Sequence, residues 1–95
     1  MDQKLQKKLE RIRLGIDGVD DEIVRQLAKR KELVLELARV KKVVKLPIYD
    51  RKREEALLAR VKAWGARHDL DAEFVEVVFR LIVMNSKEVQ YHEAL

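Results

Sequence analysis

Residues 2–44, DQKLQKKLERIRLGIDGVDDEIVRQLAKRKELVLELARVKKVV, decide the fold of this chain. Apolar residues recur in this stretch at steps of three and four, which places their side chains on one face of an α-helix. The positions that form this apolar stripe are Leu5, Leu9, Ile12, Ile16, Val19, Ile23 and Leu27. We therefore predict one long helix over residues 2–44.

Gly15 and Gly18 are the weak points of the predicted long helix. Each costs roughly 1 kcal/mol relative to Ala in a helix interior, so a break near them is the alternative. The apolar steps pass both glycines without losing phase, which favours one uninterrupted helix. About forty residues at about 1.5 Å each span roughly 60 Å, far more than the width of a 95-residue globule. We therefore expect a homodimer, in which the helix packs against a second copy of the chain.

The rest of the chain predicts two shorter helices. Pro47, the only proline, disfavours helix at the residue before it, and Asp50 then stands where a helix N-cap belongs. A second helix is expected over residues 51–67. After a turn, Asp71 is the expected cap of a third helix over residues 72–93. The apolar positions of these two helices are Leu57, Leu58, Val61, Trp64, Phe74, Val75, Val78, Phe79, Ile82 and Val89.

The length of the chain agrees with a single domain over residues 1–95. No segment alternates between apolar and polar residues as a strand would, so we predict an all-α fold. Hydrophobic residues make up 47% and charged residues 40%, which is typical of a helix-rich protein with densely charged outer faces. The absence of cysteine excludes disulfides, thiol chemistry and cysteine-based metal sites. Met1 leads into polar sequence with no apolar segment of signal-peptide or membrane-spanning length, so we expect a cytoplasmic protein without a membrane partner.

The net charge of +4 raises the question of a nucleic-acid partner. Acidic and basic residues are interspersed along the chain rather than separated into a basic arm. Only five aromatic residues are present, and they do not alternate with cations as a stacking platform would. We therefore expect no nucleic-acid partner and interpret the mild positive charge as attraction for a small anion.

Two cations continue the apolar stripe of the first helix, which runs on through Arg30, Val34, Leu37 and Lys41. A cation on a buried stripe costs several kcal/mol unless an anionic group meets it. No acidic residue lies on the stripe beside these two cations. The missing anion is therefore interpreted as a ligand.

The other two helices also carry polar residues on their inner faces. Glu54 is in phase with the apolar residues of the second helix, and Arg53 borders the same face. Ser86 and Gln90 continue the apolar face of the third helix. Taken singly, each is explained by a helix end leaving the core or by a buried pair, such as Arg30 with Glu54. Taken together they favour one polar pocket, because a small bundle would be destabilised by such groups without a use for them.

Helix geometry supports a shared pocket. Arg30 and Lys41 are eleven residues apart, about 16 Å along the axis and nearly in phase, so their side chains can converge on a compact ligand. Arg13 lies seventeen residues from Arg30, about 25 Å along the axis, too far to serve the same pocket within one chain. In an antiparallel dimer of long helices, Arg13 could reach the pocket of the partner chain.

Other chemistries have little support in the sequence. His68 and His92 lack metal-ligand spacing, and Ser86 has no His or Lys one helical turn away that would make it a nucleophile. The isolated glycines form no phosphate-binding loop. We therefore expect neither a metal nor a cofactor.

An ordered set of residues along the whole chain resembles the all-helical class of chorismate mutases. No single piece of this set is distinctive, but the order and the spacings together are specific. The set comprises Arg13 with Ile16, Asp17 and Asp20; Arg30 within residues 27–33, LAKRKEL; Lys41; residues 47–50, PIYD; Arg53 and Glu54; and Ser86 and Gln90. The resemblance implies an intertwined antiparallel homodimer with two equivalent sites that converts chorismate to prephenate without a cofactor.

On the carboxylate side of the substrate, the resemblance implies that Arg30 and the partner's Arg13 clamp the two carboxylates. Arg53 and Ser86 would assist on the ring side. Chorismate is a compact dicarboxylate, which is the kind of anion that the apolar stripe with its two cations requires.

On the reacting side, the resemblance implies that Lys41 and Gln90 donate hydrogen bonds to the ether oxygen. Glu54 and the backbone of Asp50 would hold the ring hydroxyl. The reaction is an intramolecular [3,3] rearrangement that needs no nucleophile and no general base. The site must hold the substrate in a near-attack geometry and place hydrogen-bond donors where negative charge develops. We expect Lys41 to supply most of this electrostatic stabilisation of the transition state, ~3 kcal/mol or more.

Two other functions compete with this interpretation. Isochorismate-pyruvate lyases share the scaffold but lack the acidic residue that matches Glu54, so its presence favours the mutase. A non-catalytic helical regulatory or binding domain is the alternative from another class. Retention of the complete inward polar set argues against it.

Overall fold

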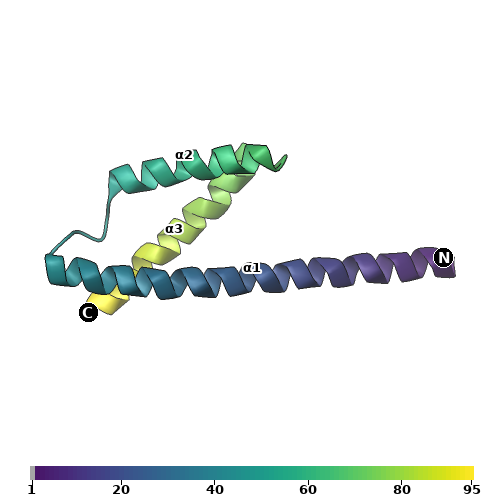
Figure 1. Cartoon of the computed structure of the whole chain (residues 1–95), viewed down its shortest axis with the longest axis horizontal. Coiled ribbons are helices and arrows are strands. Elements are labelled where there is room, and N and C mark those ends of the chain that lie inside the picture. The colour runs from purple at the N-terminus through teal and green to yellow at the C-terminus, as the bar shows by residue number, and fades with distance from the viewer. Residues whose placement is uncertain (1) are drawn as a thin grey trace. The chain divides into compact units, whose positions relative to one another are not determined.

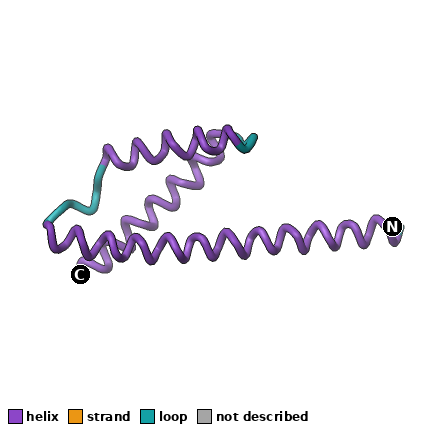
Figure 2. The backbone as a smooth tube through the Cα atoms, viewed as in Figure 1, coloured by secondary structure: helices purple, strands orange, loops and turns teal. Residues whose placement is uncertain are grey.

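A computed structural model describes residues 2–95, and it contains the three expected helices (Figures 1 and 2). They are α1 (Gln3–Val44), α2 (Arg51–Arg67) and α3 (Ala72–Ala94). No strand occurs in these residues, which confirms the all-α class. The described residues fall into two compact units, residues 2–32 and Leu33–Leu95.

The unit of residues 2–32 is helical throughout, so the prediction of an uninterrupted helix past Gly15 and Gly18 is confirmed. A Cβ atom added at either glycine would meet no other atom within 4 Å. The apolar stripe of this unit remains exposed, from 42% at Leu27 to 60% at Val19, and only Leu9 of the stripe is half-buried. This stretch therefore carries an apolar face without a core of its own.

The core of Leu33–Leu95 lies where α2 and α3 meet. Val61 is 1% exposed, and Gly65 of α2 lies against Val75 of α3 so closely that an added Cβ would be 2.8 Å from its Cγ2 atom. The last turns of α1 contribute the buried residues Val34 and Ala38. The missing side chain of Gly65 lets α2 and α3 approach closely at this point.

Three predicted inner residues of this unit differ from expectation. Leu37 is 45% exposed, Trp64 is 48% exposed and Phe74 is 59% exposed. Each lies one residue before a buried residue, namely Ala38, Gly65 or Val75. Because neighbouring helix positions differ by about 100° in direction, the bulky residue falls at the edge of the contact.

Both predicted helix caps are confirmed. The side chain of Asp50 accepts a hydrogen bond from the backbone N–H of Arg53 at 3.0 Å, and Asp71 accepts one from the N–H of Glu73 at 3.1 Å. Each carboxylate satisfies a backbone donor that the first helical turn leaves unpaired. In the part of the chain described, no helix is both long and apolar enough to cross a membrane.

Candidate active site

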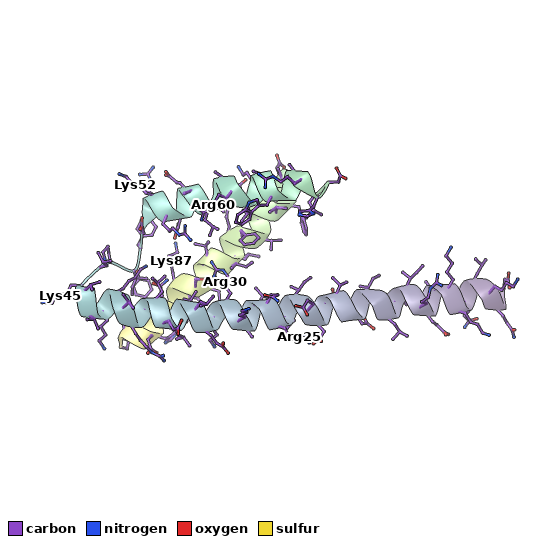
Figure 3. The ribbon with its side chains drawn as sticks, viewed as in Figure 1. Arg25, Arg30, Lys45, Lys52, Arg60 and Lys87 are labelled. Atoms are coloured by element: carbon purple, nitrogen blue, oxygen red, sulfur yellow. The ribbon has the colours of Figure 1, made fainter. Side chains whose placement is uncertain are left out.

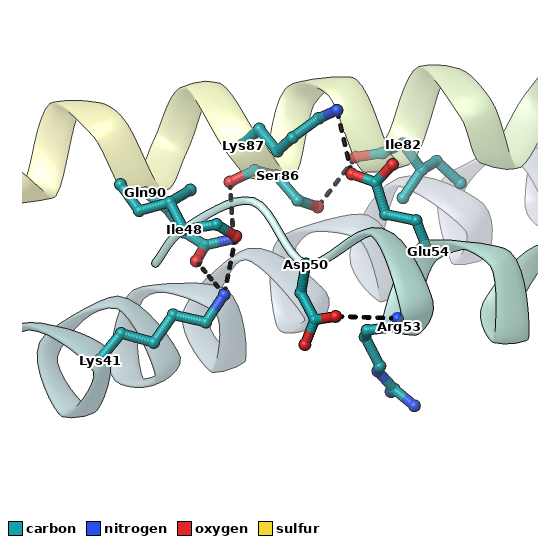
Figure 4. Close-up of polar contacts among 9 residues, drawn as sticks. All are labelled: Lys41, Ile48, Asp50, Arg53, Glu54, Ile82, Ser86, Lys87 and Gln90. Carbon is teal, nitrogen blue, oxygen red and sulfur yellow. Dashed lines mark hydrogen bonds and ion pairs between the residues drawn. The ribbon is translucent and has the colours of Figure 1, made fainter. Parts of the chain in front are cut away.

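Lys41 lies at the centre of a polar cluster inside the unit Leu33–Leu95. Its Nζ atom donates to the backbone carbonyl of Ile48 at 2.9 Å and to Oε1 of Gln90 at 3.0 Å (Figure 4). Lys41 is half-buried and Gln90 is only 5% exposed. Both acceptors are neutral, so these two hydrogen bonds hold the ammonium in place without cancelling its charge. An ammonium has three N–H donors, of which these contacts use two.

The end of α1 brings Ile48 back to Lys41. Lys45 adopts a left-handed backbone with a φ of 59°, and the N–H of Leu46 donates to the carbonyl of Lys41 at 2.9 Å. This is the Schellman arrangement that ends helices, with Lys45 in the place usually taken by glycine. The chain reversal continues through Pro47 and places the backbone carbonyl of Ile48 within hydrogen-bond distance of Lys41 Nζ. The same turn that ends the helix therefore positions its last inward cation.

Gln90 is oriented by the ammonium beside it. Because an ammonium can only donate, the amide oxygen of Gln90 must face Lys41, and its NH₂ group is directed elsewhere. That NH₂ group makes one long contact of 3.4 Å with the backbone carbonyl of Ser86. The Ser86 hydroxyl, on a residue only 8% exposed, donates to the carbonyl of Ile82 at 2.8 Å. The arrangement places two donor groups, one charged and one neutral, side by side in the interior.

Glu54 lies in the first turn of α2, where the helix dipole favours a negative charge. It is half-buried, and its Oε1 atom pairs with Nζ of Lys87 on α3 at 3.0 Å. Arg53 differs from expectation, because its side chain is exposed instead of bordering the inner face. Asp50 directs its carboxylate to the helix end, and its backbone carbonyl accepts a hydrogen bond from the N–H of Glu54 at 3.0 Å.

Lys87 and Tyr49 also belong to this cluster. The sequence interpretation missed Lys87, and it included Tyr49 only within residues 47–50 without assigning it a role. Nζ of Lys87 lies 5.0 Å from the centre of the Tyr49 ring, within the range of a cation–π contact. Lys87 follows Ser86 directly and therefore lies about 100° away from the apolar face of α3. Nothing in the periodicity distinguishes it from an ordinary surface lysine, and Tyr49 lies in a connection that has no periodicity.

Six of the eight predicted site residues belong to one unit. These are Lys41, Asp50, Arg53, Glu54, Ser86 and Gln90, all within Leu33–Leu95. Arg13 and Arg30 belong to residues 2–32, and their roles stay predictions. Among residues 2–95 no group of three or more His, Asp or Glu side chains could hold a metal ion.

Comparison with known proteins identifies the family of this chain. The family model for chorismate mutase type II matches residues 12–91, and the chain belongs to this family. It is similar to the bifunctional chorismate mutase/prephenate dehydratase of Escherichia coli K12, at 35% identity over 75 residues, or 79% of this chain and 19% of that protein. It is also similar to the chorismate mutase of Methanocaldococcus jannaschii, at 29% identity over 84 residues, or 88% of this chain and 85% of that protein. The chain thus spans about a fifth of the length of the bifunctional relatives.

Proposed function

We propose that this chain is a chorismate mutase that rearranges chorismate to prephenate without a cofactor. The observation that carries the proposal is the hydrogen-bonded pair of Lys41 and Gln90, which holds a charged and a neutral donor together in a half-buried site. Family membership names the reaction, and this pair is suited to it chemically.

The reaction requires stabilisation of charge that develops as the ether C–O bond stretches. Lys41 is held by Ile48 and Gln90, so its remaining N–H does not have to reorganise when negative charge appears on the ether oxygen. Gln90 adds an amide donor, because its oxygen is already occupied by Lys41. Preorganised donors in a site with little water act far more strongly than the same groups in water. No proton is transferred and no bond to the protein forms.

The substrate must also be held in the folded shape in which its enolpyruvyl arm lies over the ring. Glu54 and the backbone of Asp50 hold the ring hydroxyl in this proposal. Arg30 and the partner's Arg13 bind the two carboxylates, with Arg53 and Ser86 assisting. The exposure of Arg53 fits a role that begins only when a carboxylate arrives.

The proposed enzyme is a cytoplasmic intertwined homodimer. Two apolar faces support this assembly, and each lies within one unit of the chain. One is the exposed stripe of residues 2–32, since a long helix in a protein is stabilised mainly by packing of its apolar face. The other is on α3, where apolar side chains at helical spacing are 51–60% exposed, namely Phe74, Val77, Leu81 and Met84. A second copy of the chain offers matching apolar faces, and an isologous dimer would bury both pairs.

The test is to supply the purified chain separately with chorismate and with isochorismate. We expect the ultraviolet absorbance of chorismate to fall and prephenate to be the product, with no effect of a chelator. Isochorismate should be left unchanged, since the lyase relatives lack the acid that Glu54 provides here. Formation of pyruvate from isochorismate would support the lyase, and no turnover of either compound would support a non-catalytic domain.

A further inference from the structure

The contacts of Lys87 join three separate segments at the side of the proposed site. Tyr49 lies in the connection between α1 and α2. Glu54 lies in the first turn of α2 (Figure 4), and Lys87 lies on α3 (Figures 3 and 4). Nζ of Lys87 is 3.0 Å from Oε1 of Glu54 and 5.0 Å from the centre of the Tyr49 ring. One ammonium therefore contacts both the loop that follows Lys41 and the acidic residue of the site.

This contact differs from the surface ion pairs of the same molecule. The side chains of Lys87 and Glu54 are 32% and 24% exposed, whereas Arg51 and Glu55 are 78% and 64% exposed. Exposed pairs are screened by water and salt and contribute little. A pair that is partly shielded keeps more of its Coulomb interaction, so it fixes the position of the carboxylate more firmly.

The charge balance of the proposed reaction gives this pair a use. Glu54 is needed to accept a hydrogen bond from the ring hydroxyl, but its negative charge repels a substrate with two carboxylates. A cation at 3.0 Å offsets that repulsion. Because Lys87 engages Oε1, the second oxygen of Glu54 remains to accept from the hydroxyl.

We propose that Lys87 is a positioning residue that orients the Glu54 carboxylate and offsets its charge, so that a dianionic substrate can bind beside it. The proposal rests on the mutase function proposed above. Lys87 acts through Glu54 and does not touch the substrate. The Tyr49 ring restrains the ammonium, and the contact requires the aromatic face but not the hydroxyl.

The first experiment compares Lys87→Met with Lys87→Arg in the chorismate assay. Met keeps the apolar stem and removes the charge, so we expect KM to rise about 10-fold with little change in kcat. Arg restores a cation and should keep KM within about 2-fold of wild type. KM does not depend on the fraction of chains that fold, so partial unfolding lowers only the apparent kcat. An unchanged KM in Lys87→Met would overturn the proposal.

The second experiment repeats the Lys87→Met change in a Glu54→Gln background. If Lys87 acts through the charge of Glu54, its effect on KM should shrink from about 10-fold to less than about 2-fold, because the neutral amide no longer repels the substrate. An equal effect in both backgrounds would mean that Lys87 contacts the substrate directly, and the proposal would be wrong.

A matched control is available in the same helix pair. Lys62 of α2 pairs with Glu76 of α3 at 3.3 Å, with side chains 42% and 22% exposed, and neither residue belongs to the candidate site. Lys62→Met should leave KM unchanged while removing a similar α2–α3 ion pair. An equal rise in KM would show a general effect of loosening the helices and would overturn the specific role of Lys87.

The activity of the wild-type chain distinguishes a failure of the proposed mutase function from a failure of the proposed role of Lys87. If the wild-type chain does not convert chorismate, the proposed function fails and the role of Lys87 fails with it. If the wild-type chain is active and the Lys87 and Glu54 effects are independent, only the role of Lys87 is overturned.

Discussion

The glycines of the two units differ in how closely other atoms pack against them. In residues 2–32, Gly15 and Gly18 stand in open space, and the apolar stripe around them is exposed. In Leu33–Leu95, Gly65 is buried against Val75, and the polar groups Ser86 and Gln90 are buried as well. The first unit has an apolar face in need of a partner, whereas the second has a core with a prepared polar site. The comparison teaches that residue type alone does not reveal whether a position is packed.

The largest expected effect tests whether the first unit serves the site of another copy. Arg13→Ala and Arg30→Ala should each be nearly inactive, because each removes a cation that binds a substrate carboxylate. Unfolding the two variants together and refolding them at equal ratio should make about half of the dimers mixed. About a quarter of all pockets are then complete, and activity should rise toward a quarter of wild type.

That recovery depends on Arg13 acting in the partner's pocket. If Arg13 and Arg30 served the same pocket within one chain, no mixed dimer would have a complete site. Mixed dimers confirmed by differential tagging, but without regained activity, would exclude the shared site.

A second prediction concerns the polar site of the second unit. Lys41→Ala should lower kcat/KM by at least ~10²-fold, as loss of a preorganised donor does. Lys42→Ala is the matched control, since Lys42 is exposed and lies on the next position of α1. Steady-state kinetics on both variants, with helicity checked by circular dichroism, measure the difference. Near-full activity in Lys41→Ala would remove the central residue from the proposed mechanism.

A third prediction compares the glycines directly. Gly65→Ala places a Cβ atom 2.8 Å from Val75, a β-branched residue whose rotamer is restricted in a helix. Overpacking costs about 1–3 kcal/mol, which exceeds the helix-propensity gain of roughly 1 kcal/mol, so the variant should be less stable. Gly18→Ala meets no atom and lies on the side away from the apolar stripe, so it should be more stable by up to about 1 kcal/mol.

Denaturant unfolding at one fixed protein concentration measures both glycine variants, since the stability of a dimer depends on concentration. A stabilised Gly65→Ala variant would mean that α2 and α3 are farther apart than described. A destabilised Gly18→Ala variant would mean that a partner chain also covers the outer side of the helix.

The smallest effect is expected at the surface of the second unit. Hydrogen bonds from Arg80 and then from Lys62 lower the pKa of Glu76 from its ordinary value of 4.5. Because the folded-state pKa is the lower one, the stabilisation is fully present above pH 4.5 and is lost as pH falls through the folded-state value. Glu76→Gln should therefore be slightly less stable than wild type at neutral pH, and the gap should close below pH 4.5. Thermal unfolding at a series of pH values measures this difference in stability, and a gap that does not narrow as the pH falls below 4.5 would contradict the assignment.

Most of the fold could be predicted because its signals are local. The three-and-four spacing, Pro47 and the capping carboxylates of Asp50 and Asp71 set the helix ends, and the structure agrees to within a residue at Gln3 and Ala94. The inward polar residues Lys41 and Gln90 were also predictable, since a polar group on an apolar face is visible in the pattern. Their roles in binding and catalysis stay predictions until the assays are done.

Local sequence patterns are enough to assign which side of each helix is apolar, where each helix ends, and which polar residues interrupt the apolar faces. The tertiary structure alone decided which groups meet, such as Lys41 with Ile48 and Gln90, and Lys87 with Glu54. Periodicity gives a direction around each helix axis but no position along a neighbouring helix. That position depends on side-chain volumes at the crossing, above all the missing side chain of Gly65 beside Val75. A cation just off the apolar face, such as Lys87, therefore becomes part of the site only after the helices have packed.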